Sequence, residues 1–132
     1  MRAAALPAVC CGAIMLLAGC GPSGPPRYQV SGSINYNGRP VPAGHVIFEP
    51  DAAQGNAGPA AYAKIQNGRY KTAADSGVVG GPMVVRINGR SGTGSPESPQ
   101  GPLLFPREYR AKIELPKEDT THDFEIPPFN PT

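Results

Sequence analysis

The sequence lacks several features that would point to common functions. It contains no tryptophan, and its three cysteines all lie within the first 20 residues. Residues 21–132 therefore cannot form a disulfide, so their core must be held by packing alone. The formal net charge is only +2, and there is no basic cluster. This balance gives no electrostatic case for binding nucleic acid.

The first 19 residues have the layout of a secretory signal peptide. Met1-Arg2 forms a short basic start, Ala3–Gly19 carries no charge, and Ala8–Ala18 is a compact apolar run. A transmembrane helix is the alternative, but it needs roughly 20 apolar residues. Because this run is shorter and contains Gly12, the sequence predicts a cleaved leader over residues 1–19.

Leu17-Ala18-Gly19-Cys20, at the end of this leader, resembles the lipobox of bacterial lipoproteins. The resemblance implies cleavage before Cys20, a diacylglyceryl group on its sulfur and a free amine that can also be acylated. Two or more acyl chains, each stabilised by ~0.8 kcal/mol per buried CH₂, anchor a protein stably. We therefore expect lipidation at Cys20, with membrane lipid as partner, outside the cytoplasmic membrane. The outer membrane is favoured over the inner, because Gly21 follows the cysteine and not an aspartate typical of inner-membrane retention.

The chain from Cys20 onward has the length of one small domain. Residues 20–27 are predicted to form a Pro/Gly-rich tether, and residues 28–127 the domain. Within the domain, residues 91–102 have no apolar side chain beyond prolines, which predicts a mobile loop. Residues 128–132 form a C-terminal tail.

Alternation of apolar and polar residues predicts strands throughout the domain. No segment keeps a helical periodicity over ten residues, and about seven short strands are expected, over residues 28–36, 44–48, 60–66, 69–72, 83–88, 111–115 and 121–126. Three Asn-Gly pairs, at residues 37–38, 67–68 and 88–89, predict turns. The second pair predicts a hairpin. This pattern is typical of an all-β, antiparallel sandwich.

Several segments also resemble carboxypeptidase-regulatory-like, or transthyretin-like, domains. The matching segments are Tyr28–Pro50, Asn67-Gly68-Arg69-Tyr70, Gly81–Ile87, Pro106-Arg107-Glu108-Tyr109 and Asp123-Phe124-Glu125-Ile126. With the lipobox and tether, the chain is similar to small lipoproteins of planctomycete-type bacteria. The resemblance implies a sandwich of about seven strands that ends in a hairpin. Met83 replaces a usual tyrosine, and the extra Gly80-Gly81 predicts a bulge. These motifs are structural and imply no activity.

The sequence offers no catalytic or metal-binding motif. The two histidines, His45 and His122, show no ligand spacing such as His-x-x-x-His, so they are expected at the surface or rim of the domain. Their convergence as a metal or acid–base pair is the alternative. A transthyretin-fold hydrolase acting on 5-hydroxyisourate ends in Tyr-Arg-Gly-Ser, whereas this chain ends Phe129-Asn130-Pro131-Thr132. We therefore predict no catalytic residue, no metal and no cofactor.

We expect a non-enzymatic structural or interaction module, and the alternative is a carbohydrate-binding or cell-surface assembly module. Partners would be a cell-surface protein or glycan. Small β-sandwiches often bind glycans through exposed aromatic residues, and Tyr62 and Tyr109 are the candidate ligand contacts. The basic residues Arg86, Arg90, Arg107 and Arg110 are expected on a solvated surface, with contact to an anionic surface polymer as the alternative.

Overall fold

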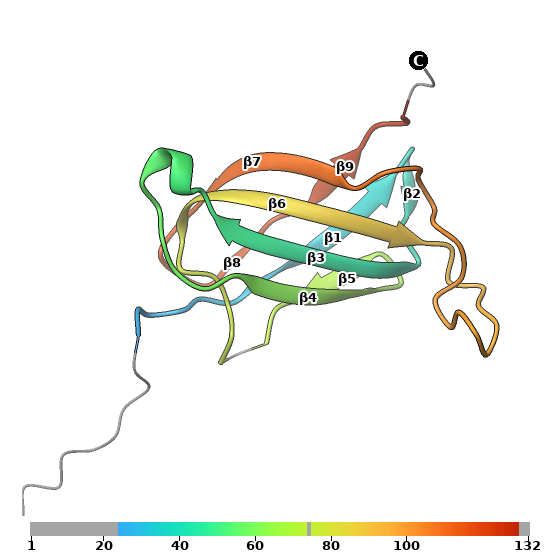
Figure 1. Ribbon diagram of the computed structural model, residues 1–132, viewed down its shortest axis with the longest axis horizontal. Coiled ribbons are helices and arrows are strands. Elements are labelled where there is room, and N and C mark those ends of the chain that lie inside the picture. Colours follow the sequence, from blue (N-terminus) through green and yellow to red (C-terminus); the bar gives the residue numbers. More distant parts are fainter. Residues whose placement is uncertain (1–23, 74, 130–132) are drawn as a thin grey trace, which may run out of the picture.

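A computed structural model describes residues 24–73 and 75–129 of the chain (Figure 1). The predicted leader, the lipidation site Cys20 and the last three residues lie outside the described residues. The described chain is all-β apart from a single 3-10 turn, η1 (Ala52–Gln54). The predicted all-β class is thus confirmed. No helix in residues 24–73 and 75–129 has the length and apolar character needed to cross a membrane.

Nine strands join into one curled sheet. They are β1 (Val30–Tyr36), β2 (Arg39–Pro40), β3 (Ala43–Pro50), β4 (Ala61–Gln66), β5 (Arg69–Lys71), β6 (Gly81–Arg90), β7 (Tyr109–Leu115), β8 (Thr120–Thr121) and β9 (Phe124–Ile126). The strand order is β2-β1-β5-β4-β3-β6-β7, with β8 and β9 also paired to β1. In Figure 1 the sheet curls so that β1 and β8 run behind β3 and β6.

The inner side of the curl is the core, and the alternation of each strand decides what enters it. In β4, for example, alanines and Ile65 are buried, while the intervening residues are exposed. Phe48 on β3 lies with its ring centroid 5.9 Å from that of Tyr70 on β5 and 6.4 Å from that of Phe124 on β9. These aromatic contacts join opposite parts of the curled sheet, so one core serves all the strands.

Two of the three predicted Asn-Gly turns are confirmed. Asn37 and Gly38 have φ values of 50° and 76°, and Asn67 and Gly68 have 51° and 76°. Such positive φ pairs join antiparallel strands whose twist they match. The second turn connects β4 to β5 in the predicted hairpin.

The turn predicted at Asn88-Gly89 is wrong, because both residues continue β6. They pair with His45 and Gly44 of β3. A side chain at position 89 would collide with the ring of Phe105, which is buried against this strand. The glycine therefore serves close packing and not a reversal of the chain.

The predicted C-terminal hairpin is also wrong. β7 pairs with β6, whereas β8 and β9 run parallel to β1, so the sheet is not purely antiparallel. Two carboxylates support this arrangement, because Asp119 accepts a hydrogen bond from the Gln29 backbone N–H at 2.8 Å and Asp123 one from the Ser33 N–H at 2.9 Å. The parallel pairing of β9 with β1 also places Phe124 in the core.

The loop predicted to be mobile, residues 91–102, projects from the end of the domain opposite to the entry of the chain (Figure 1). It is mostly exposed and is closed by backbone hydrogen bonds, among them Ser91 N–H to Pro102 O at 3.0 Å and Gly92 N–H to Gln100 O at 2.9 Å. The loop is thus held together by its own backbone hydrogen bonds, and its mobility stays a prediction.

Candidate functional site

The outer surface of the sheet carries two clusters of charged side chains. We call the first the ionic row, formed by Glu49, Arg86, Glu108 and Arg110. We call the second the basic groove, lined by Ser31, Gly32, Ser33, Lys64, Gln66, Arg69, Tyr70, Lys71, Thr121 and Asp123. Both use residues that alternate outward from buried neighbours, so the same strands that build the core also present these surfaces.

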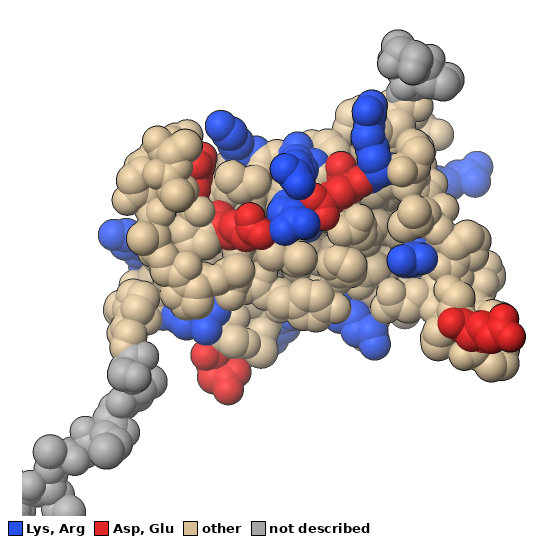
Figure 2. Space-filling view, in the orientation of Figure 1, with Lys and Arg blue, Asp and Glu red and all other residues tan. Residues whose placement is uncertain are grey.

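The ionic row crosses β3, β6 and the start of β7 as alternating charges (Figure 2). Arg86 lies 2.7 Å from a carboxylate oxygen of Glu49 and 2.8 Å from one of Glu108, and Arg110 lies 3.0 Å from the same Glu108 oxygen. The hydrogen bond from Arg86 lowers the pKa of Glu108 to about 2, and hydrogen bonds from Asn88 and Arg110 act in the same direction. The row therefore neutralises its own charges.

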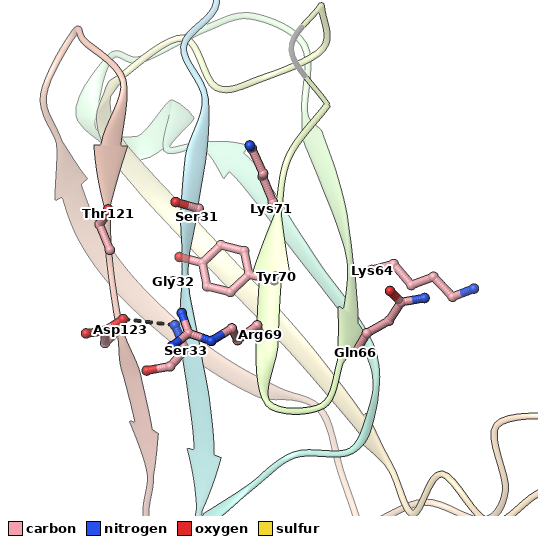
Figure 3. Close-up of a pocket in the computed structure, with 10 residues that line it drawn as sticks. All are labelled: Ser31, Gly32, Ser33, Lys64, Gln66, Arg69, Tyr70, Lys71, Thr121 and Asp123. Atoms are coloured by element: carbon pink, nitrogen blue, oxygen red, sulfur yellow. Dashed lines mark hydrogen bonds between the residues drawn. The ribbon is translucent and has the colours of Figure 1, made fainter.

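The basic groove is an open depression of about 670 Å³ on the outer side of β1, β5 and β4. Figure 3 shows Arg69 and Lys71 on β5 beside the hydroxyl-bearing residues of β1, while the side chain of Lys64 extends from β4 away from β5. β5 produces this pattern because only its central residue, Tyr70, is buried. The sequence Arg-Tyr-Lys thus places two cations on one face.

One wall of the groove is built by backbone contacts around Gly32. A side chain at Gly32 would collide with the carbonyl oxygen of His122, and the Tyr70 hydroxyl donates a hydrogen bond to that same oxygen. Burial raises the pKa of Tyr70, so the hydroxyl stays protonated as a donor. Asp123 is the next residue after His122 in the chain. Hydrogen bonds from Ser33 lower the pKa of the Asp123 carboxyl group.

The cations of the groove form no direct ion pair with another described residue, although the charge of Arg69 adds to the hydrogen bonds of Ser33 in lowering the pKa of Asp123. Among the described residues, the ion pairs found within 4.0 Å all belong to the ionic row, and none includes Lys64, Arg69 or Lys71. Asp123, the carboxylate that lines the groove, accepts the Ser33 N–H. The groove is therefore a positively charged surface whose cations remain available to an external anion.

Tyr62, a ligand contact predicted from the sequence, lies next to this groove. Its side chain is 56% exposed and stacks on His45, with 5.7 Å between ring centroids. The His45 ring is in turn 3.2 Å from the Asn88 amide nitrogen. Because Tyr62 and Lys64 both point outward from β4, the aromatic pair borders the groove.

Tyr109, the other predicted ligand contact, does not lie beside the basic groove. Tyr109 is partly buried and packs against the core, where it pairs with Ile87 of β6. The two tyrosines thus point to opposite sides of the sheet. The alternation of Tyr109, Ala111, Ile113 and Leu115 with charged residues in β7 is the sequence signal that could have assigned Tyr109 to the inner face.

The two histidines lie in separate surroundings. His45 contacts Tyr62 and Asn88, whereas the ring of His122 packs on Phe124 at 4.6 Å. Within residues 24–73 and 75–129, no group of three or more His, Cys, Asp or Glu side chains is arranged to hold a metal ion.

The four arginines expected on a solvated surface have distinct roles. Arg86 and Arg110 belong to the ionic row. Arg90 donates to the Gly101 carbonyl at 3.2 Å, and Arg107 lies 5.4 Å from the centre of the Phe129 ring. Arg86 lies at the surface and is partly exposed, but it forms ion pairs with Glu49 of β3 and with Glu108, which immediately precedes β7.

Comparison of the chain with models of known protein families and with curated proteins finds no match.

Proposed function

We propose that this protein is a lipid-anchored, non-enzymatic binding module held outside the cytoplasmic membrane through Cys20. The lipobox-like end of the predicted leader carries this proposal. The short distance between that site and the folded domain supports it. Arg27 already donates hydrogen bonds to the carbonyls of Gly77 and Ala60, at 2.8 and 2.9 Å. A tether over residues 20–27 reaches at most about 25 Å, which would keep the domain close to the membrane.

The domain itself is proposed to be a transthyretin-like sandwich. The curled sheet supports this assignment, because β3 and β9, which are not paired with each other, meet through the Phe48 and Phe124 rings, with Tyr70 of β5 packed against both. This assignment concerns the fold alone and implies no activity.

Metabolic labelling with palmitate tests the anchor. The wild-type protein should take up label and fractionate with the outer membrane, whereas Cys20→Ser should take up none and leave the membrane fraction. The double variant Cys10→Ser/Cys11→Ser is the matched control, because it alters leader cysteines that are not part of the lipobox. Label on Cys20→Ser would refute the proposal, and so would its absence from the wild type.

Carbohydrate binding is the second candidate function, and the exposed Tyr62–His45 stack favours it. Amphipathic aromatic rings provide rigid contact area for a ligand with both apolar and polar faces. Assembly through an edge strand is less favoured at β7, which forms one end of the strand path. Its outward side chains, Arg110, Lys112 and Glu114, are charged, which protects an edge against strand addition.

A further inference from the structure

We propose that the basic groove and the Tyr62–His45 stack form one surface that binds an acidic polysaccharide, whose sugar rings carry carboxylate or sulfate groups. This inference rests on carbohydrate binding as the second candidate function. It names the site and the class of ligand.

The strand register makes the surface continuous. His45 lies opposite Lys64, Gln66 lies opposite Arg69, and Arg69 lies opposite Ser33. Four neighbouring strands, β3, β4, β5 and β1, thus contribute side chains to one outward strip. With strands spaced about 4.8 Å apart, the strip extends roughly 14 Å across the sheet. Along β4, Tyr62 and Lys64 are roughly 7 Å apart on the same face.

The charges select for an anion. Lys64, Arg69 and Lys71 face the strip with Asp123 as the carboxylate among the lining residues, and that carboxylate already binds the Ser33 N–H. A guanidinium presents a planar set of donors that fits a carboxylate or sulfate oxygen pair. Arg69 is therefore placed to bind the charged group of a sugar, with Lys71 beside it on β5.

The uncharged groups favour a sugar over a simple anion. Ser31, Ser33 and Thr121 bring hydroxyls, and Gln66 brings an amide, all of which can exchange hydrogen bonds with sugar hydroxyls. The exposed ring of Tyr62 offers a flat apolar face on which a sugar ring can stack. A phospholipid headgroup would use the cations but would have no need of the aromatic ring. The side chains spread along an open face (Figure 3), which suits a polymer passing over it.

Binding of polygalacturonate by the full-length protein, purified in detergent, tests the proposal. The wild type should bind polygalacturonate or dextran sulfate more tightly than neutral dextran, and the binding should weaken as salt is added. Arg69→Gln/Lys71→Gln should weaken binding about tenfold or more, as expected for the loss of charged hydrogen bonds. Tyr62→Ala should also weaken it, and that loss should persist at high salt.

Arg110→Gln/Lys112→Gln is the matched control, because it removes the same two charges from exposed positions on β7. It should retain wild-type affinity, and an equal loss in this control would overturn the proposal. Equal or tighter binding to neutral dextran or to DNA would overturn it too, and so would binding to phosphatidylglycerol vesicles that is lost in Arg69→Gln/Lys71→Gln, because the acyl chains on Cys20 bind vesicles without the groove. Tyr62-dependent binding of dextran alone would overturn the acidic ligand but keep carbohydrate binding. Absence of all glycan binding would overturn the acidic ligand and carbohydrate binding together. The outcome of these glycan experiments does not affect the palmitate test of the anchor.

Discussion

In the ionic row, Arg86 and Arg110 lie directly opposite each other on β6 and β7, and one oxygen of Glu108 lies within 3.0 Å of both. In the basic groove, Arg69 lies opposite Ser33 and Gln66, which are uncharged. The first arrangement satisfies its cations internally, and the second leaves them exposed. Strand register thus decides whether a surface cation stabilises the fold or stays available to a ligand.

The largest effect is expected from Gly32→Ala, which should damage the basic groove and leave the ionic row intact. The new methyl group would meet the His122 carbonyl and push β8 and β9 away from β1. Overpacking of this kind should lower the free energy of unfolding by about 3 kcal/mol and weaken polygalacturonate binding. Urea unfolding measures the first effect. The neighbouring Ser33→Ala should cost less than about 0.5 kcal/mol, and wild-type stability of Gly32→Ala would contradict the packing described.

Glu108→Gln should have a smaller effect, confined to the ionic row. The pKa of Glu108 is lowered from 4.5 to about 2 in the folded protein, so its stabilisation is present above pH 4.5 and disappears as the pH falls through 2. We expect a loss of about 1 kcal/mol at neutral pH and none near pH 2, since solvent screens this partly exposed row.

Unfolding experiments across this pH range check the effect of Glu108→Gln. Glu114→Gln, at an exposed position on β7, serves as the control and should match the wild type at every pH. A loss of stability in Glu108→Gln that did not change with pH would show that the carboxylate charge is not its cause. Binding of polygalacturonate should be unaffected, because the variant leaves the groove unchanged.

The smallest effect is expected from Asp123→Asn, which makes the groove more positive. The amide oxygen can still accept the Ser33 N–H, so stability should hardly change. Affinity for polygalacturonate at low salt should rise about threefold, as expected for removing one exposed like charge from the ligand's path. Titration at low and high salt measures this gain, which should shrink as salt is added. Unchanged or weaker binding at low salt would argue that Asp123 does not face the ligand.

Local pattern was enough to predict most strands and the β4–β5 hairpin, because alternation and the Asn67-Gly68 turn are local properties. It failed at Asn88-Gly89, where the role of the glycine is set by Phe105, a residue distant in sequence. It also failed for β8 and β9, because parallel pairing with β1 depends on contacts that span most of the chain.

The candidate site shows the same division. Tyr62 could be singled out from the sequence as a candidate contact, and the structure exposes it. Lys64, Arg69 and Lys71 could not be recognised as a group, because their common face exists only once β4, β5 and β1 are paired. Tyr109 was singled out equally, but it faces the core.

The sequence by itself determined the all-β class, the β4–β5 hairpin and the prediction of a lipid anchor at Cys20, since these depend on neighbouring residues. Only the tertiary structure decided which cations are neutralised. Arg86 and Arg69 are both basic residues on the outer face of a strand, and the sequence around them does not show which one has ionic partners. Arg86 gains direct ion pairs with Glu49 and Glu108 from elsewhere in the chain. Arg69 lies opposite Ser33 and Gln66 and forms no direct ion pair within the described part of the chain. Ion pairing needs atoms within about 4 Å, and strands far apart in sequence reach that distance only after folding.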